Sequence, residues 1–62
     1  MLLFASSEQA ASDVGAALAW AGFDVLFQHP GDAYPLSVQV AEHREAEVLD
    51  IAKAVDPDIE SG

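Results

Sequence analysis

The stretch FDVLFQHPGDAYPLSVQV, residues 23–40, sets the topology of the chain because two alternating segments flank a turn within it. In residues 23–29, apolar side chains at every second position fall on one side of an extended chain, which is the periodicity of a strand. Residues 30–32, Pro-Gly-Asp, are typical of a turn, since proline fixes its own φ and glycine can adopt a positive φ. Residues 36–40 alternate again. The stretch therefore predicts a strand, a turn and an antiparallel return strand.

The residues before this hairpin predict a strand followed by a helix. Met1 to Ala5 is a short apolar run, as in a buried strand. Ser6 and Gln9 match the S-x-x-Q pattern of a capping box, in which the two side chains satisfy free backbone N–H groups. An apolar face at helical spacing follows, and Gly22 comes directly after it, as expected for a helix stop. The residues of that face are Ala10, Val14, Ala17, Leu18 and Ala21.

The residues after the hairpin predict a second helix that begins near His43 or Arg44. Pro57 disfavours helical geometry at the residue before it, so this helix should end at about Asp56. Residues 58–62 are expected to form a loose C-terminal tail. The predicted inner stripe of the helix consists of Arg44, Val48, Ile51, Ala52 and Val55, and its outward positions are Ala46, Glu47, Asp50 and Lys53.

The predicted order is β-α-β-β-α, which makes residues 1–62 a single α+β domain. The simplest arrangement is a three-stranded antiparallel sheet with two helices on one face, an incomplete ferredoxin-like fold, in which the third strand lies between the first two. The other face of the sheet would carry Ser37 and Gln39, with Leu26 and an apolar residue of the first strand beside them. Such a half-apolar face is either ordinary surface or the interface of a homodimer, and the sequence leaves both interpretations open.

No set of residues in the sequence matches a catalytic, cofactor or metal site. His43 and Glu47 have the i, i+4 spacing that can place two metal ligands on one helix, but no third histidine and no cysteine complete the set. Residues 56–60 alternate carboxylates without the glycine and the final acid of a calcium loop. Ser6 and Ser7 lack the G-x-S-x-G context of a nucleophile. We therefore expect a protein that is not an enzyme and uses no cofactor or metal.

Two aromatic residues have two interpretations each. Trp20 falls at the flank of the first helix's apolar face, where it either covers the edge of the core or anchors a binding interface. Tyr34, beside the hairpin turn, has the same two interpretations.

The opening residues MLLFASS fit neither a signal peptide nor a membrane span, so we expect a cytoplasmic protein.

Charge is the strongest functional signal in the sequence. Eleven Asp and Glu residues against two Lys and Arg residues give a net charge of −9. DNA, RNA and anionic lipid would repel this chain, so its partners should be basic proteins. Seven carboxylates gather in residues 42–60, three of them near the C-terminal end of the second helix, where the helix dipole disfavours anions. The predicted partner-binding residues are Glu42, Glu45, Glu47, Asp50, Asp56, Asp58 and Glu60.

The acidity could also arise without a binding role, in two ways. A high net charge keeps a small domain soluble. Acidic, lysine-poor proteins are also routine in a halophilic cytoplasm. Neither origin requires an acidic binding site. Imitation of nucleic acid does require one, and a rigid helix that holds carboxylates outward can provide it by occupying a groove lined by Lys and Arg.

In size, charge and layout the whole chain resembles the small, acidic, phage-encoded anti-CRISPR proteins that mimic double-stranded DNA. The stretches EHREAEVLD and DPDIE would form the mimicking surface, and Arg44 and Lys53 within the acidic region depart from the pattern. The resemblance rests on no shared motif. It implies an inhibitor that acts in the cytoplasm of an infected bacterium. Its partner would be the DNA-binding subunit of a type I CRISPR effector complex, at the basic surface that reads the protospacer-adjacent motif.

Two rival functions remain. One is a ferredoxin-like or ACT-like regulatory module that dimerises through its open sheet face or binds a small effector. Leu26 and Tyr34 would matter more than the acids in that case. The other is an antitoxin-like partner of a basic nuclease, which would share the electrostatics of the DNA mimic and differ only in its target.

Overall fold

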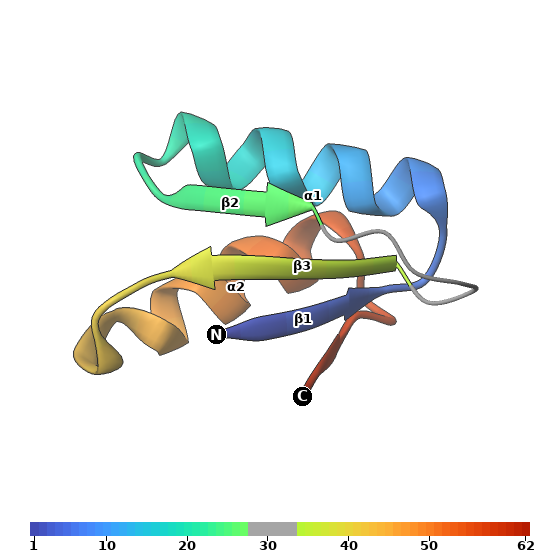
Figure 1. Cartoon of the computed structure of the whole chain (residues 1–62). Helices are drawn as coiled ribbons and strands as arrows, with labels where there is room; N and C mark the ends of the chain where they lie inside the picture. Colours follow the sequence, from blue (N-terminus) through green and yellow to red (C-terminus); the bar gives the residue numbers. More distant parts are fainter. Residues whose placement is uncertain (28–33) are drawn as a thin grey trace.

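The computed structural model describes residues 1–27 and 34–62 (Figure 1). The predicted turn at residues 30–32 and His29 lie outside the described residues. Along the chain the elements are β1 (Leu2–Ala5), α1 (Glu8–Trp20), β2 (Asp24–Phe27), β3 (Tyr34–Gln39), the 3₁₀ turn η1 (Glu42–Arg44), α2 (Glu45–Val55) and β4 (Glu60–Ser61). In this part of the chain, neither helix is long and apolar enough to cross a membrane.

The strands form one antiparallel sheet in the order β2-β3-β1-β4 within the described residues. The prediction that the third strand lies between the first two is confirmed, because β3 pairs with both β1 and β2. The sheet has four strands here rather than the three expected from the sequence. In Figure 1, β2, β3 and β1 run side by side, and α1 and α2 lie across the same sheet.

The expected loose tail at residues 58–62 is wrong, because β4 pairs with β1 at the edge of the sheet. Ile59 is buried in the core and holds this segment against the domain. The N–H of Gly62 then donates to the carbonyl of Leu2 at 2.9 Å. A strand of two residues is too short to show alternation, which is why the sequence pattern did not reveal it.

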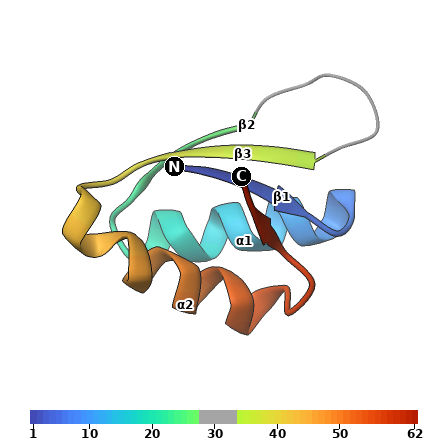
Figure 2. The same cartoon turned by 90° about the horizontal axis from the view of Figure 1, so that it is seen from below.

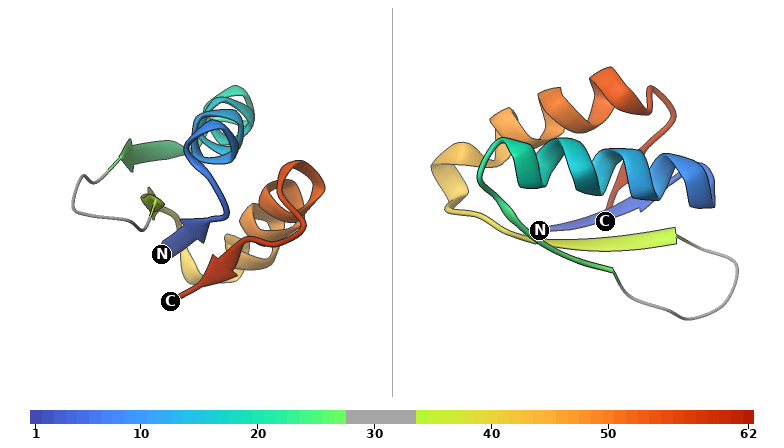
Figure 3. Two further views of the ribbon diagram at one scale, coloured as in Figure 1. Left: turned by 90° about the vertical axis from the view of Figure 1, so that its right-hand side faces the viewer. Right: turned by 90° about the horizontal axis from the view of Figure 1, so that it is seen from above.

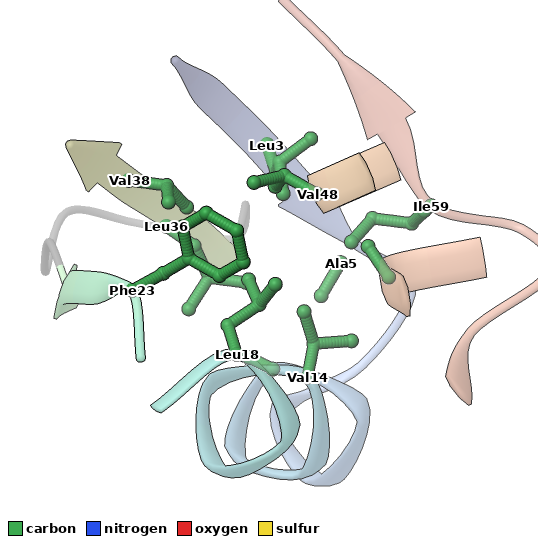
Figure 4. Packing of buried hydrophobic residues seen from close by; sticks show 11 residues of the cluster. Leu3, Ala5, Val14, Leu18, Phe23, Leu36, Val38, Val48 and Ile59 are labelled. Atoms are coloured by element: carbon green, nitrogen blue, oxygen red, sulfur yellow. The ribbon is translucent and has the colours of Figure 1, made fainter. Parts of the chain in front are cut away.

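The helices α1 and α2 pack on the same face of the sheet, as predicted (Figures 2 and 3). The core lies between this helical layer and the sheet, where side chains from both helices meet those of β1 and β3 (Figure 4). The largest fully buried side chains are Leu3, Val14, Leu18, Leu36, Val38 and Val48. The opposite face of the sheet has no covering layer among the described residues.

Helix α1 begins one residue later than the capping-box pattern predicts. The cap is Ser7, whose Oγ accepts the N–H of Ala10 at 3.1 Å. Gln9 does not reach back to the cap, and its amide donates to Asp13 at 3.0 Å instead. The predicted stop is confirmed, because Gly22 has a φ of 94°, which favours glycine. The buried face of the helix consists of Ala11, Val14, Gly15 and Leu18.

Helix α2 ends at Val55, as Pro57 predicts, and follows the 3₁₀ turn η1. Val48 and Ala52 are the buried residues of α2. The guanidinium of Arg44, just before the helix, lies 4.6 Å from the centre of the Phe23 ring. Val55 is 39% exposed, so the predicted inner stripe does not extend to the last turn.

Candidate interaction surfaces

The described part of the chain contains ten carboxylate side chains, and eight of them belong to exposed residues. The ninth, Glu45, is half-buried, and the tenth, Asp56, is buried. The exposed acidic residues are Glu8, Asp13, Asp24, Glu42, Glu47, Asp50, Asp58 and Glu60. Acidic residues therefore occur on the helices, on the edge strands and in the turns between them, so negative charge surrounds the domain.

The structure spreads the seven predicted partner-binding residues over several elements instead of one helix face. Glu42 lies in η1, and Glu45 and Glu47 lie in the first turn of α2, which suits the helix dipole. Asp58 and Glu60 come after α2 has ended. Because the 11 residues of α2 span about 16 Å at 1.5 Å per residue, the acids before and after the helix are separated by its length.

Asp56 belongs to the architecture of the domain and is not available to a partner. It is 4% exposed, and its carboxylate accepts three hydrogen bonds within the chain. The backbone N–H of Ser6 donates to Oδ2 at 2.8 Å, and the Ser6 hydroxyl donates to Oδ1 at 2.8 Å. The N–H of Asp58 donates to Oδ1 at 3.2 Å. Asp56 thus ties the end of α2 to the start of α1.

The position of Asp56 explains why an anion follows α2 directly. The dipole of α2 disfavours a carboxylate at the C-terminal end of that helix. Asp56, however, lies against Ser6, two residues before α1 begins, and the N-terminal end of α1 favours a carboxylate. The pKa of Asp56 is lowered, chiefly by the hydrogen bond from the Ser6 backbone. Burial opposes this shift, and the bonds from the Ser6 hydroxyl and the Asp58 N–H support it. The capping-box pattern assigned Ser6 to the helix cap and carried no signal of this long-range contact.

One of the predicted surface acids is paired with a cation. The guanidinium of Arg44 donates to both carboxylate oxygens of Glu47, with the closest approach at 3.1 Å. Both side chains are about half exposed, so the pair contributes about 1 kcal/mol or less to stability. The effect on the surface is larger than the effect on stability, because the pair cancels one negative charge at the start of α2. Asp50, in the middle of α2, has no such partner within the described residues.

The uncovered face of the sheet combines apolar and polar side chains and has a carboxylate on each edge strand. Opposite residues of an antiparallel pair share a face, so the register places Leu26 of β2, Ser37 of β3 and Leu2 of β1 in one row. The next row contains Pro35, Phe4 and Glu60, from β3, β1 and β4. In the row on the other side, Asp24 lies opposite Gln39. We call these eight residues the open face.

Leu26 is the most accessible apolar side chain of the open face, with 61% of its surface exposed. Leu2 and Phe4 are partly buried, and Pro35 is buried. The sequence prediction is confirmed for the positions that it named, since Ser37 and Gln39 lie in β3 with Leu26 and Leu2 beside Ser37. The prediction did not include the other four members of the open face.

Trp20 does not cover the core, because 91% of its surface is exposed at the last residue of α1. The interpretation of Trp20 as a lid is therefore wrong. Tyr34 begins β3 and is 37% exposed; it lies opposite Ala5, on the helical side of the sheet. Neither aromatic residue belongs to the open face.

Groups of metal-binding side chains and hollows in the surface are the other candidates for a chemical site. Among them, no group of three or more His, Cys, Asp and Glu side chains could hold a metal ion. A shallow, open hollow at the start of α1 is lined by Ser7, Glu8, Gln9 and Ser12. Ser7 in this hollow is occupied by capping the helix. The features that stand out are therefore two surfaces, the dispersed carboxylates and the open face.

No family model, curated protein or solved structure matches this chain, so its function has to be argued from its own residues.

Proposed function

We propose that this chain is a non-enzymatic binding protein that competes with nucleic acid for a basic protein surface. The observation that carries the proposal is its charge density. The net charge of −9 is distributed over a body 30 Å long and 19 Å across, which averages one negative charge per about 3.3 Å of length. A single strand of duplex DNA carries one negative charge per about 3.4 Å. Duplex DNA as a whole carries one negative charge per about 1.7 Å of its axis. The domain thus matches the charge spacing of one strand and has about half the axial charge density of the duplex that it would displace.

The arrangement of the carboxylates supports this role. Eight acidic residues are exposed within the described chain, while the described cations, Arg44 and Lys53, offset little of their charge. Of the predicted partner-binding set, Asp56 is buried and Glu47 is paired with Arg44. The five members that contribute most to the field around the molecule are Glu42, Glu45, Asp50, Asp58 and Glu60. A basic partner would release bound counterions on association, as it does on binding DNA, so affinity should fall steeply as salt is added.

The target class that we propose first is a type I CRISPR effector complex, at the basic surface that reads target DNA. A basic nuclease, inhibited in the manner of an antitoxin, presents the same electrostatic surface and is the second target to test. Both proposals place the protein in the bacterial cytoplasm. Both require that the domain and DNA cannot bind the target together.

A regulatory module is the second candidate function, and the strand order favours it. The order β2-β3-β1-β4, with α1 and α2 on one face, suggests a ferredoxin-like fold with a very short last strand. In this alternative the open face would join two copies of the chain. Light scattering that finds a monomer over the working range of protein concentration would count against it.

Displacement of DNA tests the main proposal. A labelled duplex is bound to a purified type I effector complex or a purified basic nuclease, and fluorescence anisotropy follows its release as the chain is added. We expect full release at about 50 mM salt, and direct binding of the chain to the target in the absence of DNA should be much weaker at about 200 mM salt. If the domain joins the complex without releasing DNA, or if neither target binds it at low salt, the proposal fails.

A further inference from the structure

We propose that the open face binds a basic amphipathic helix of the partner protein, with its apolar stripe on Leu26, Leu2 and Phe4 and its Lys or Arg side chains on Asp24 and Glu60. This inference rests on the proposed function in requiring a basic partner, and it names the surface that the partner contacts. The sequence pointed to α2 for that role. The structure points to the other side of the sheet.

The spacing of the apolar side chains on the open face fits a helix. Leu26 and Leu2 flank Ser37 in one row, on strands separated by two strand spacings, or about 10 Å. A helix with its side chains is about 10 Å across. Phe4 lies two residues along β1 from Leu2, about 7 Å further on the same face. Successive turns of a helix, about 5.4 Å apart, could therefore contact both rows.

The charges of the open face indicate the chemistry of the partner. Its charged members are Asp24 on the edge strand β2 and Glu60 on the edge strand β4, so both described edges are negative. The described cationic side chains belong to other elements, Arg44 to η1 and Lys53 to α2. An apolar strip with a carboxylate on each side complements a helix that has an apolar stripe flanked by cations.

The same charges argue against a second copy as the occupant. A copy packed on this face would bring its own Asp24 and Glu60 to an interface that contains two carboxylates and, among the described residues of the open face, no cationic side chain. Like charges at an interface cost free energy unless they are paired. The net charge of −9 on each copy adds a long-range repulsion.

A designed peptide provides the first test. The probe is a labelled helical peptide with leucine along one face and lysine along the other, and its controls are a scrambled peptide of the same composition and a leucine–glutamate peptide. We expect the chain to bind the amphipathic lysine peptide in preference to both controls. Amide chemical-shift changes should centre on β1 and β3, and the emission of Trp20, the single tryptophan, should stay unchanged because α1 lies on the other side of the sheet.

Two variants distinguish the open face from α2. Leu26→Ser removes the exposed apolar contact, and circular dichroism verifies that it folds. It should weaken peptide binding by about tenfold. The control, Glu47→Gln with Asp50→Gln, removes charge from α2 and should change affinity by no more than about twofold. Equal binding by wild type and Leu26→Ser, or a blue shift of Trp20 on binding, would overturn the inference.

The outcomes separate this inference from the proposed function. If the wild-type chain displaces DNA from a basic protein and Leu26→Ser does so equally well, the proposed function is supported, and the open face is not the contact surface. If the peptide binds the open face but DNA is not displaced from either target, the open face is supported as a binding surface and the proposed function is contradicted. If the wild-type chain forms a dimer and Leu26→Ser dissociates it, the occupant of the open face is a second copy of the chain and not a helix of a partner.

Discussion

Asp50 and Asp56 belong to the same acid-rich segment, but the fold uses them in opposite ways. Asp50 is exposed on α2 and makes no hydrogen bond among those of the described side chains. Asp56 is buried and accepts three hydrogen bonds that join the end of α2 to the start of α1. Neighbouring acids can therefore have unrelated roles, one as part of the surface field and the other as part of the framework.

The largest difference between the two residues should appear in stability. Asp56→Ala leaves the N–H and hydroxyl of Ser6 and the N–H of Asp58 without their acceptor, so the thermal midpoint should fall by several degrees. Asp50→Ala should leave the midpoint nearly unchanged, because surface substitutions usually alter stability by less than about 0.5 kcal/mol. Thermal unfolding followed by circular dichroism measures both. Equal thermal midpoints for the two variants would contradict the role of Asp56 in holding the fold together.

The comparison also predicts a pH dependence. The folded state lowers the pKa of Asp56, so its stabilising effect is fully present above the ordinary value of about 3.8 and is lost as pH falls through the lower folded value. The difference in midpoint between wild type and Asp56→Ala should therefore be constant near neutral pH and shrink in acid. A difference that persists unchanged in strong acid would show that the carboxylate charge does not matter.

The partner-binding contribution of the acids depends on position as well as number. Asp24→Lys with Glu60→Lys and Glu47→Lys with Asp50→Lys each raise the net charge from −9 to −5, since each replacement adds two charges. The first pair lies on the open face and should weaken binding to a basic partner by at least about tenfold more than the second. The second pair should act mainly by slowing association. Stopped-flow kinetics measures both effects, and identical losses would mean that only net charge counts.

The smallest expected effect comes from the ion pair on α2. Arg44→Gln removes the bridge to Glu47 and the contact with Phe23, and it should reduce stability by about 1 kcal/mol or less. It also uncovers the charge of Glu47, so binding to a basic partner should become slightly tighter. Urea unfolding and the peptide titration measure the two effects. A large loss of stability would show that Arg44 holds α2 against the sheet.

The parts of the fold that were predicted correctly have signals that are local in the sequence. Alternation over residues 23–29 and 36–40 predicted β2 and β3, and Pro57 predicted the end of α2. The parts that were missed depend on single long-range contacts. Ser6 and Ser7 are equally good caps by type, and only the contact between Ser6 and Asp56 assigns the cap to Ser7.

The candidate surface was harder to predict for a similar reason. Sequence proximity grouped seven acids, but burial removed Asp56 and the length of α2 separated the others. The open face joins residues from four strands that are distant in sequence, among them Leu2, Leu26 and Glu60. Alternation predicted that Leu26, Ser37 and Gln39 share this face with a residue of the first strand. The sequence pattern did not contain the exact register or the strand β4, which adds Glu60 beside Phe4.

The central claim is that this domain occupies a basic surface in place of nucleic acid, and the salt dependence of its binding to such a surface tests the claim most directly. The measurement is the dissociation constant for a purified DNA-binding target at a series of salt concentrations, with and without duplex DNA. We predict that log affinity falls linearly with log salt with a slope of several units, since each neutralised charge contributes about one. DNA should raise the apparent dissociation constant in proportion to its concentration. A flat salt dependence, or an affinity that DNA leaves unchanged, would contradict the claim.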